Sequence, residues 1–252
     1  MKKITAKALA QAAGGVLAHE GNEPVAEHIS LDSRKMAGND LFVPIIGERA
    51  DGHDYICMAI GNGATVVFTS RHKTEEEVQE AILTQCKGDK EKETAAKAAA
   101  WICVPDTRKA LQDFGAYCRR NNPIPLVGIT GSVGKTTTRE MVAAALSAGF
   151  LVYKTPGNSN SQVGVPITVA EIPENAEIGV IELGMSEPGE MTRIANVAQV
   201  NCAVMTNIGV AHIEQLGSQE NILKEKLHIQ DGMSEKGTLF LNGDDPLLRD
   251  VV

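Results

Sequence analysis

A glycine-rich run stands between an apolar segment and a segment whose apolar residues recur at helical spacing. The run is Gly128-Ile-Thr-Gly-Ser-Val-Gly-Lys-Thr-Thr-Thr138. Residues 125–129 are typical of a buried strand, and the apolar stripe between residues 141 and 146 is typical of a helix. Glycines let the backbone approach an anion closely, and a helix N-terminus offers free N–H groups and the positive end of the helix dipole. The order strand, loop, helix therefore predicts an α/β sheet with a phosphate-binding loop.

This loop predicts a nucleotide site that holds a magnesium ion. Lys135 is expected to reach the terminal phosphates of ATP, and the Thr136 hydroxyl is expected to ligate Mg²⁺. The spacing differs from the common G-x-x-x-x-G-K-[ST] pattern, because Ile129 stands where the first glycine would be. The alternative is a glycine-rich turn without a ligand. The residues predicted to contact ATP here are Gly131, Ser132, Val133, Gly134, Lys135, Thr136 and Thr137.

The composition is that of an ordinary globular protein, with 43% hydrophobic and 22% charged residues in 252. A net charge of −8 argues against nucleic acid or an anionic membrane as a partner, since both need a basic face. The five cysteines show no C-x-x-C pair, which favours a reducing compartment over a disulfide scaffold or zinc site. No apolar run suggests a signal peptide or a membrane span, so we expect a cytoplasmic protein.

Helix and strand signals alternate before the loop. The charged run Lys87–Thr94 interrupts them and predicts a solvated loop or the end of a helix. We expect a domain boundary near Val104–Pro105, which divides the chain into residues 1–104 and 105–252. The elements predicted in the first part are a helix over 5–13, a strand over 40–44, a helix over 54–60, and strands over 64–68 and 101–104.

A regular βα series follows the loop and predicts a parallel sheet with ligands at the carboxyl ends of its strands. Its predicted strands cover residues 151–153, 178–182, 202–205 and 238–241. Glu182 closes the second of these, which suits a metal-binding carboxylate; a capping or surface glutamate is the alternative. His212 and Glu214 follow the third strand at the same edge, although a lone histidine is more often a satisfied polar residue than a ligand.

Other polar residues allow more than one interpretation. Asn158 and Asn160 lie in a loop rich in turn formers, and their amides suit phosphate, a metal-bound water or substrate. Lys224 and Lys226 are two residues apart on a predicted helix; taken alone, both would be solvated. Near the N-terminus, Arg34 has the rigid guanidinium fork that suits a diphosphate.

Together these stretches resemble the Mur ligase family of peptidoglycan synthesis, and within it the ligases that add D-alanyl-D-alanine. The motifs occur in the same order along essentially the whole chain. They are Asp32-Ser-Arg34, Asp40-Leu-Phe42, Asp51-Gly-His-Asp54, Gly131 to Thr138, Gly157-Asn-Ser-Asn160, Gly164-Val-Pro166, Glu182-Leu-Gly184, Asn207 to Ser218 and Asn242-Gly-Asp-Asp245.

The resemblance implies an ATP-dependent ligase that converts the terminal carboxylate of UDP-N-acetylmuramoyl-tripeptide (UDP-MurNAc-tripeptide) to an acyl phosphate, which the amine of D-Ala-D-Ala then attacks. It implies a small N-terminal α/β domain for the UDP substrate and a P-loop ATPase domain with a mostly parallel sheet. It also implies a monomer and a C-terminal amine-binding domain that would follow Val252.

Residue roles carried over from the family follow the same motifs. Lys226 corresponds to a lysine that family members carry as a carbamate formed with CO₂, and Asn242 to a residue near the adenine. The residues implied to bind substrate are Ser33, Arg34, Asp51, His53, Asn158 and Asn160. The residues implied to hold two Mg²⁺ ions are Thr136, Glu182, His212 and Lys226, and the catalytic set is Lys135, Glu182, His212 and Lys226.

Two other functions stay open at this point. One is the sister ligase that adds the third residue of the peptide, since its N-terminal motifs are similar. The other is a module that binds a nucleotide or a UDP-sugar without catalysis.

Overall fold

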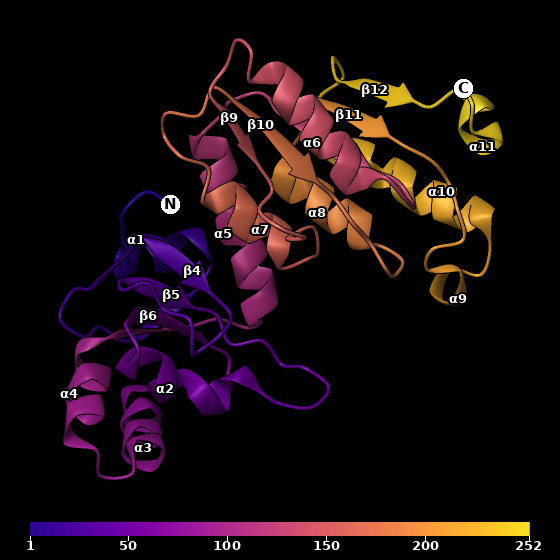
Figure 1. Cartoon of the computed structure of the whole chain (residues 1–252). Helices are drawn as coiled ribbons and strands as arrows, with labels where there is room; N and C mark the ends of the chain where they lie inside the picture. The colour runs from indigo at the N-terminus through magenta and orange to yellow at the C-terminus, as the bar shows by residue number, and fades with distance from the viewer. Residues whose placement is uncertain (252) are drawn as a thin grey trace. The chain divides into compact units, whose positions relative to one another are not determined.

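The computed structural model describes residues 1–251, which divide into two compact units, Met1–Phe114 and Gly115 onward (Figure 1). This division falls inside helix α5 (Thr107–Asn121). The boundary expected from the sequence, at residues 104–105, lies just before that helix and stays a proposal. In the described residues, no helix is both long and apolar enough to cross a membrane.

The first unit is built on a five-stranded sheet with the order β2-β7-β6-β5-β4, in which only the β2–β7 pair is antiparallel. The same unit also contains a separate two-stranded antiparallel sheet, β1–β3. The bounds are β1 Ile4–Thr5, α1 Ala6–Ala12, β2 Val16–His19, β3 Val25–Ala26, β4 His28–Ser30, β5 Asp40–Phe42, η1 Gly52–Tyr55, α2 Ile56–Gly61, β6 Ala64–Thr69, α3 Glu75–Cys86, α4 Lys90–Ala98 and β7 Ala100–Cys103.

Local signals account for most of these elements. The Thr5 side chain accepts a hydrogen bond from the Ala8 amide and so caps α1, as an N-cap threonine does. The charged run Lys87–Thr94 contains no buried residue, as predicted, but the prediction of a loop or a helix end was wrong in that a new helix, α4, begins inside it. Asp89 caps this helix, and α4 buries Ala96 against the cluster that contains Trp101. Alanines spaced along a charged helix were too weak an apolar stripe to be recognised as buried.

The second unit contains a five-stranded, wholly parallel sheet with the order β12-β11-β8-β10-β9. The mostly parallel α/β sheet expected from the sequence is confirmed. The bounds are β8 Leu126–Thr130, α6 Lys135–Leu146, β9 Val152–Lys154, α7 Gly164–Ala170, β10 Ile178–Glu182, α8 Glu190–Ala198, β11 Cys202–Met205, α9 Ile213–Leu216, α10 Gln219–Leu227, η2 His228–Gly232, β12 Thr238–Leu241 and α11 Pro246–Arg249.

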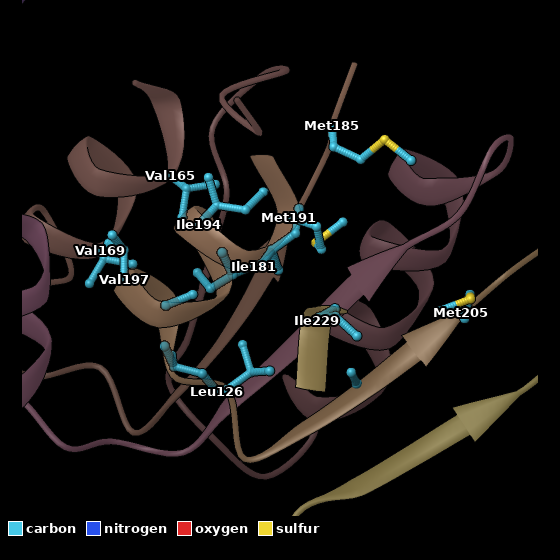
Figure 2. Packing of buried hydrophobic residues seen from close by; sticks show 14 of the residues in the cluster. Leu126, Val165, Val169, Ile181, Met185, Met191, Ile194, Val197, Met205 and Ile229 are labelled. Carbon is cyan, nitrogen blue, oxygen red and sulfur yellow. The ribbon is translucent and has the colours of Figure 1, made fainter. Parts of the chain in front are cut away.

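Neighbouring residues of one strand reach opposite faces of this sheet, and both faces are covered. Val180 packs in a cluster with Ala143 of α6, whereas Ile181 packs in a second cluster with Ile194 and Val197 of α8 (Figure 2). Because both faces are buried, the strand is apolar without polar alternation, as parallel strands in α/β proteins are. Burial of each such side chain contributes about 1.5–3 kcal/mol.

A buried arginine ties the end of α5 to the start of the sheet. The Arg119 guanidinium donates to the carbonyl oxygens of Ala198 (2.9 Å) and Ile124 (2.9 Å), and also to the side chain of Asn201 (3.3 Å). The Asn201 carboxamide oxygen in turn accepts the Leu126 amide, the first of β8. Burial lowers the pKa of Arg119. These bonds fix the strand that leads into the glycine-rich loop.

Candidate nucleotide and metal site

The parallel register brings three sequence motifs to one edge of the sheet. Glu182 lies opposite Ile129 in β8, and Met205 lies opposite Thr130. The glycine-rich loop, the carboxylate of β10 and the segment after β11 therefore leave the sheet side by side. This is the edge where the sequence predicted the chemistry.

Gly131, the first residue of the loop, leaves no room for a side chain. Its φ is +141°, and a Cβ at this position would lie 1.9 Å from the Thr206 Oγ1 atom. Only glycine fits, because any side chain would collide with the segment after β11. Gly134, with φ +83°, is the N-cap of α6 and supplies no side-chain cap, so the first-turn amides stay open to a ligand.

Two lysine ammonium groups converge on one carbonyl oxygen of this loop. The Gly131 oxygen accepts from Lys135 Nζ at 2.8 Å and from Lys226 Nζ at 3.2 Å. Lys226 is only 1% exposed. Burial and the charge of Lys135 lower the pKa of Lys226 to about 8, and burial lowers the pKa of Lys135 as well. Two like charges held together, one buried and one half-buried, favour an anionic ligand between them.

Two hydroxyl groups beside these lysines lack a partner. Across residues 1–251, the buried side-chain nitrogen and oxygen atoms without a hydrogen bond are Thr130 Oγ1 and Ser132 Oγ. A buried hydroxyl without a partner costs about 1–3 kcal/mol, and native proteins keep few of them. Both flank Gly131, so the loop offers unused polar atoms as well as positive charge.

Glu182 is held by three side chains and is 1% exposed. Its Oε2 atom accepts from Thr136 Oγ1 at 3.1 Å and from Arg139 Nη1 at 3.2 Å, and its Oε1 atom accepts from Asn160 Nδ2 at 2.8 Å. The surface-glutamate alternative is therefore excluded. Arg139 also donates to the carbonyl oxygen of Gly157 at 2.7 Å, which joins the polar loop before α7 to α6.

These residues suit Mg²⁺ better than a transition metal. No group of three or more His, Cys, Asp or Glu that could hold a metal occurs in the described part of the chain. Mg²⁺ needs no such group, because it keeps several waters and takes one or two protein oxygens plus substrate phosphates. The Glu182 carboxylate and the Thr136 hydroxyl, which share a hydrogen bond, can supply those oxygens.

The remaining predicted residues lie in different surroundings. Lys226 is buried whereas Lys224 is exposed, so solvation of both lysines is wrong. His212 is exposed at the N-cap of α9, and partial desolvation with the charges of Lys226 and Lys135 lowers its pKa. Asn158 is exposed. Asn242 donates to the carbonyl oxygen of Thr206 at 2.9 Å, so its amide is already engaged.

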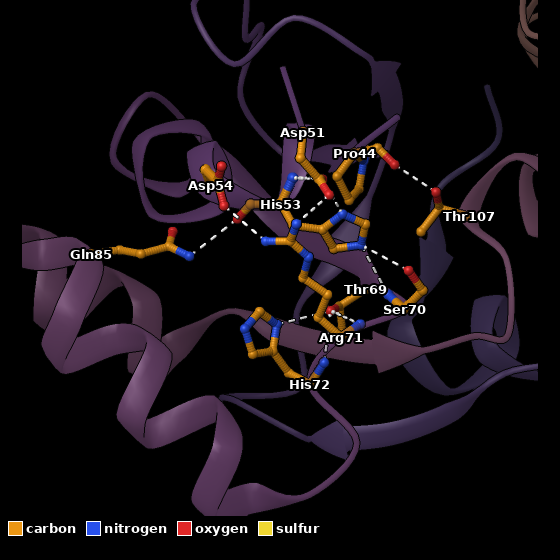
Figure 3. Close-up of polar contacts among 10 residues, drawn as sticks. All are labelled: Pro44, Asp51, His53, Asp54, Thr69, Ser70, Arg71, His72, Gln85 and Thr107. Atoms are coloured by element: carbon orange, nitrogen blue, oxygen red, sulfur yellow. Dashed lines mark hydrogen bonds and ion pairs between the residues drawn. The ribbon is translucent and has the colours of Figure 1, made fainter. Parts of the chain in front are cut away.

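In the first unit, a second polar cluster surrounds His53, whose side chain is fully buried (Figure 3). Asp51 Oδ1 lies 2.5 Å from His53 Nδ1, and the Ser70 amide donates to His53 Nε2 at 3.0 Å. Arg71 donates to the carboxylates of Asp51 and Asp54. Burial raises the pKa of Asp51, but hydrogen bonds from His53 and the charge of Arg71 lower it by more.

The hydrogen bonds define how His53 can act. Because a backbone amide only donates, Nε2 is the acceptor, so Nδ1 carries the proton and donates a hydrogen bond to Asp51. Ser70 Oγ is 3.1 Å from Nε2, so the order Asp, His, Ser matches that of a nucleophilic triad. The Ser70 amide already occupies the Nε2 lone pair, so His53 cannot remove the Ser70 hydroxyl proton. The cluster positions backbone and side chains and is no nucleophile.

The other predicted substrate residues of this unit are less enclosed. The Arg34 side chain is 78% exposed and donates to the Asp32 carboxylate, while Ser33 Oγ donates to Met58 Sδ at 3.5 Å. A cavity of about 240 Å³ has Ile45, Ser70 and Arg108 among its lining residues. Ser70 thus joins the His53 cluster to an open space in the same unit.

Two family models match successive parts of the chain. The Mur ligase family catalytic domain matches residues 25–118, and the Mur ligase middle domain matches residues 129–252. The chain belongs to the Mur ligase family. Among curated relatives, the UDP-N-acetylmuramoyl-tripeptide–D-alanyl-D-alanine ligase of Bacillus subtilis is 37% identical over all of this chain and 51% of its own length. The Escherichia coli ligase of the same name is 31% identical over 97% of this chain and 49% of its own.

Solved Mur ligase structures agree with these matches. A crystal structure of MurF from Acinetobacter baumannii superposes with a TM-score of 0.83 at 29% identity, covering 98% of this chain and 50% of that one. MurF ligase from Thermotoga maritima, solved in complex with ADP, gives 0.72 at 30% identity over 89% of this chain and 47% of that one. The chain spans about half the length of the curated relatives it matches.

Sequence reasoning missed several residues that build the two clusters. Arg139 looked like a surface residue of α6, and Ser70 and Arg71 followed a strand without a motif. Asn207 was noticed only as the first residue of a longer segment. For Arg139, the one available signal was its place three residues after Thr136, which puts both side chains on the same face of α6.

Proposed function

We propose that this chain is the UDP-substrate and ATP-binding part of a ligase that adds D-Ala-D-Ala to UDP-MurNAc-tripeptide through an acyl phosphate. The observation that carries the proposal is the convergence of Lys135, Lys226 and the Thr136–Glu182 pair around one glycine-rich loop. That loop begins a helix at the carboxyl edge of a parallel sheet. The names of the relatives at 31–37% identity supply the substrate class.

ATP would bind with its phosphates at the α6 N-terminus. Lys135 would leave the Gly131 carbonyl and contact the terminal phosphates, because a phosphate oxygen is a stronger acceptor for an ammonium group than a carbonyl is. Ser132 Oγ, which lacks a partner, would donate to the same phosphates. In this proposal Thr136 and Glu182 hold one Mg²⁺, which supplies neutralisation of the charge that builds up during phosphoryl transfer.

Lys226 is proposed to carry a carbamate. A pKa of about 8 leaves about a tenth of this amine neutral at pH 7, and the neutral amine is the form that attacks CO₂. The nitrogen forms a bond to the CO₂ carbon and loses a proton to solvent. The product is an anion beside Lys135, which removes the repulsion between the two ammonium groups. Its oxygens, with His212, would serve a second Mg²⁺.

The first unit is proposed to bind the UDP end of the substrate. Arg34 is exposed and can offer its fork to a diphosphate. Ser33 borders Met58 on the same unit, and Asp51 and His53 would act by holding Ser70 and Arg71 in place. Asn158 could contact the muramoyl peptide directly. Asn160 would act through Glu182, and Asn242 near the adenine. A cytoplasmic, monomeric protein fits this proposal.

Calorimetric titration of the chain with ADP and Mg²⁺, repeated on Lys135→Ala, tests the nucleotide part. Binding that depends on Lys135 supports the proposal, and equal affinity of the two proteins contradicts it. Release of ADP by the full-length protein with UDP-MurNAc-tripeptide then tests the ligase part. Dependence of that release on D-Ala-D-Ala supports the assignment. Dependence on a diamino acid with a UDP-MurNAc-dipeptide would assign the sister ligase instead.

A further inference from the structure

The phosphate loop is short, and its backbone forms hydrogen bonds with another segment of the chain. β8 ends at Thr130 and α6 begins at Lys135, so only residues 131–134 lie between them. Within this span, Val133 has a side chain that points to solvent and is 67% exposed. The hydrogen-bond partners of its backbone N–H and C=O groups lie outside the loop, in the segment after β11.

One asparagine side chain satisfies both groups. Val133 N–H donates to Asn207 Oδ1 at 3.0 Å, and Asn207 Nδ2 donates to the Val133 carbonyl oxygen at 3.1 Å. The same segment adds two contacts, one from its backbone and one from a side chain. The Ser132 amide donates to the Asn207 carbonyl oxygen at 2.9 Å, and Thr206 Oγ1 donates to the Val133 carbonyl oxygen at 2.6 Å.

The segment that carries Asn207 is itself anchored. The Ile208 amide donates to Asp245 Oδ2 at 2.8 Å, and Asn242 Nδ2 donates to the Thr206 carbonyl oxygen at 2.9 Å. Asp245 also caps α11 through the amides of Leu247 and Leu248. The carboxyl end of β12 therefore holds the segment after β11, and that segment holds the loop after β8.

We propose that Asn207 is a positioning residue that keeps the phosphate loop in its ligand-binding shape before the nucleotide arrives. The inference rests on the proposed nucleotide site and adds Asn207 to the residues that shape it. A loop that is already ordered loses less conformational entropy on binding, so its affinity is higher. A side-chain amide suits the task because it combines a donor and an acceptor in one plane. Aspartate lacks the donor.

The first experiment tests the two hydrogen bonds between the Asn207 side chain and the Val133 backbone, here called the clamp, without any nucleotide. NMR solvent-exchange rates of the Val133 and Ser132 amides are compared in the 252-residue chain, Asn207→Ala and Asn207→Asp. We expect about 10-fold faster exchange of the Val133 amide in Asn207→Ala and little change in Asn207→Asp, whose carboxylate still accepts that N–H. The Ser132 amide, bonded to the Asn207 backbone, should change less. General destabilisation would not produce this pattern. Equal Val133 exchange in all three proteins would overturn the clamp.

The second experiment measures ADP affinity by calorimetry, with Asn221→Ala as the matched control. Asn221 Nδ2 also donates to a backbone carbonyl, that of Leu216 at 2.7 Å, which is not a residue of the loop. We expect about 10-fold weaker ADP binding in Asn207→Ala and in Asn207→Asp, and unchanged binding in Asn221→Ala. Equal affinity of Asn207→Ala and the parent chain would overturn this inference alone. No ADP binding by the parent chain would overturn the proposed function, and the purpose of the clamp with it.

Discussion

The two polar clusters of this chain differ in how completely their atoms are paired. Around His53, both ring nitrogens, the Asp51 carboxylate and the Arg71 guanidinium have partners within the first unit. Around Gly131, two lysines share one carbonyl oxygen and two buried hydroxyls have no partner. A fully paired network stabilises the fold at its own position, whereas an incompletely paired one holds free energy that a ligand can release. The contrast indicates that the Gly131 cluster is suited to bind a ligand and that the His53 cluster holds neighbouring residues in place.

The largest expected effect separates the clusters by ligand affinity. Lys135→Ala should weaken ADP binding about 10- to 100-fold, because a charge-assisted contact to phosphate is lost. The free energy of unfolding of the ligand-free chain should not fall, since the substitution also removes repulsion with Lys226. Calorimetry and urea unfolding measure the two quantities. Lys224→Ala, at an exposed position, is the control and should change neither. A marked loss of stability in Lys135→Ala would show that Lys135 stabilises the ligand-free fold, as His53 is expected to do.

The reverse pattern is expected in the paired cluster. His53→Phe should lower the free energy of unfolding by about 2–4 kcal/mol, because Asp51 and the Ser70 amide lose their partner inside the protein. ADP affinity should stay within about 2-fold of the parent value, since the contacts that hold the loop all lie in the second unit. Urea unfolding monitored by circular dichroism measures the first quantity. An unchanged unfolding midpoint would contradict a positioning role for His53.

Lys226 sharpens the comparison through pH. Its pKa, lowered to about 8, means that the neutral amine increases as pH rises through 8, about 10-fold between pH 7 and pH 9. Carbamate formation at fixed dissolved CO₂ should follow this increase, as ¹³C NMR with labelled CO₂ can measure. Lys226→Ala should lose the signal.

The lowered pKa of Lys226 also determines whether its contribution to stability rises or falls with pH. The unfolded lysine keeps its proton to about pH 10.4, so the contribution of Lys226 to the stability of the CO₂-free chain should rise as pH rises through 8. It is measured as the difference in unfolding free energy between the parent chain and Lys226→Ala, because the buried cysteines contribute with the opposite sign in both proteins. A carbamate signal independent of pH between 7 and 9, or a stability difference between the two proteins that does not change over that range, would show that burial does not control this amine.

The smallest effect is expected at the exposed edge of the first unit. Arg34→Ala should leave the urea midpoint unchanged, because the Arg34 side chain is 78% exposed and bonds to Asp32, two residues away. The affinity for UDP-MurNAc-tripeptide should fall about 3-fold if the guanidinium meets the diphosphate. Fluorescence titration measures the affinity, with Arg34→Lys as the conservative comparison. A lowered midpoint would show that Arg34 stabilises the fold, as the fully paired network around His53 is expected to do.

Most of the fold and much of the site could be predicted from local pattern. The strand–loop–helix run around Gly131, the apolar strand that ends in Glu182 and the threonine that caps α1 all rely on contacts within a few residues. Periodicity and capping record such contacts directly. The same holds for the family, because its motifs are short and follow one another in order. α4 was misjudged, since its alanine stripe is weakly apolar, and β2, β4 and α3 were not among the predicted elements.

What tertiary structure alone decided are the pairings between residues far apart in the chain. Lys226 meets the Gly131 carbonyl, Arg139 meets Glu182, and Asn207 meets Val133. In sequence these look like a surface lysine, a surface arginine and a turn asparagine. Their roles come from burial and from the register of β8, β10 and β11, which places segments tens of residues apart at one sheet edge. A local pattern can say that a polar side chain is present, but its partner and its charge state depend on what the folded chain brings against it.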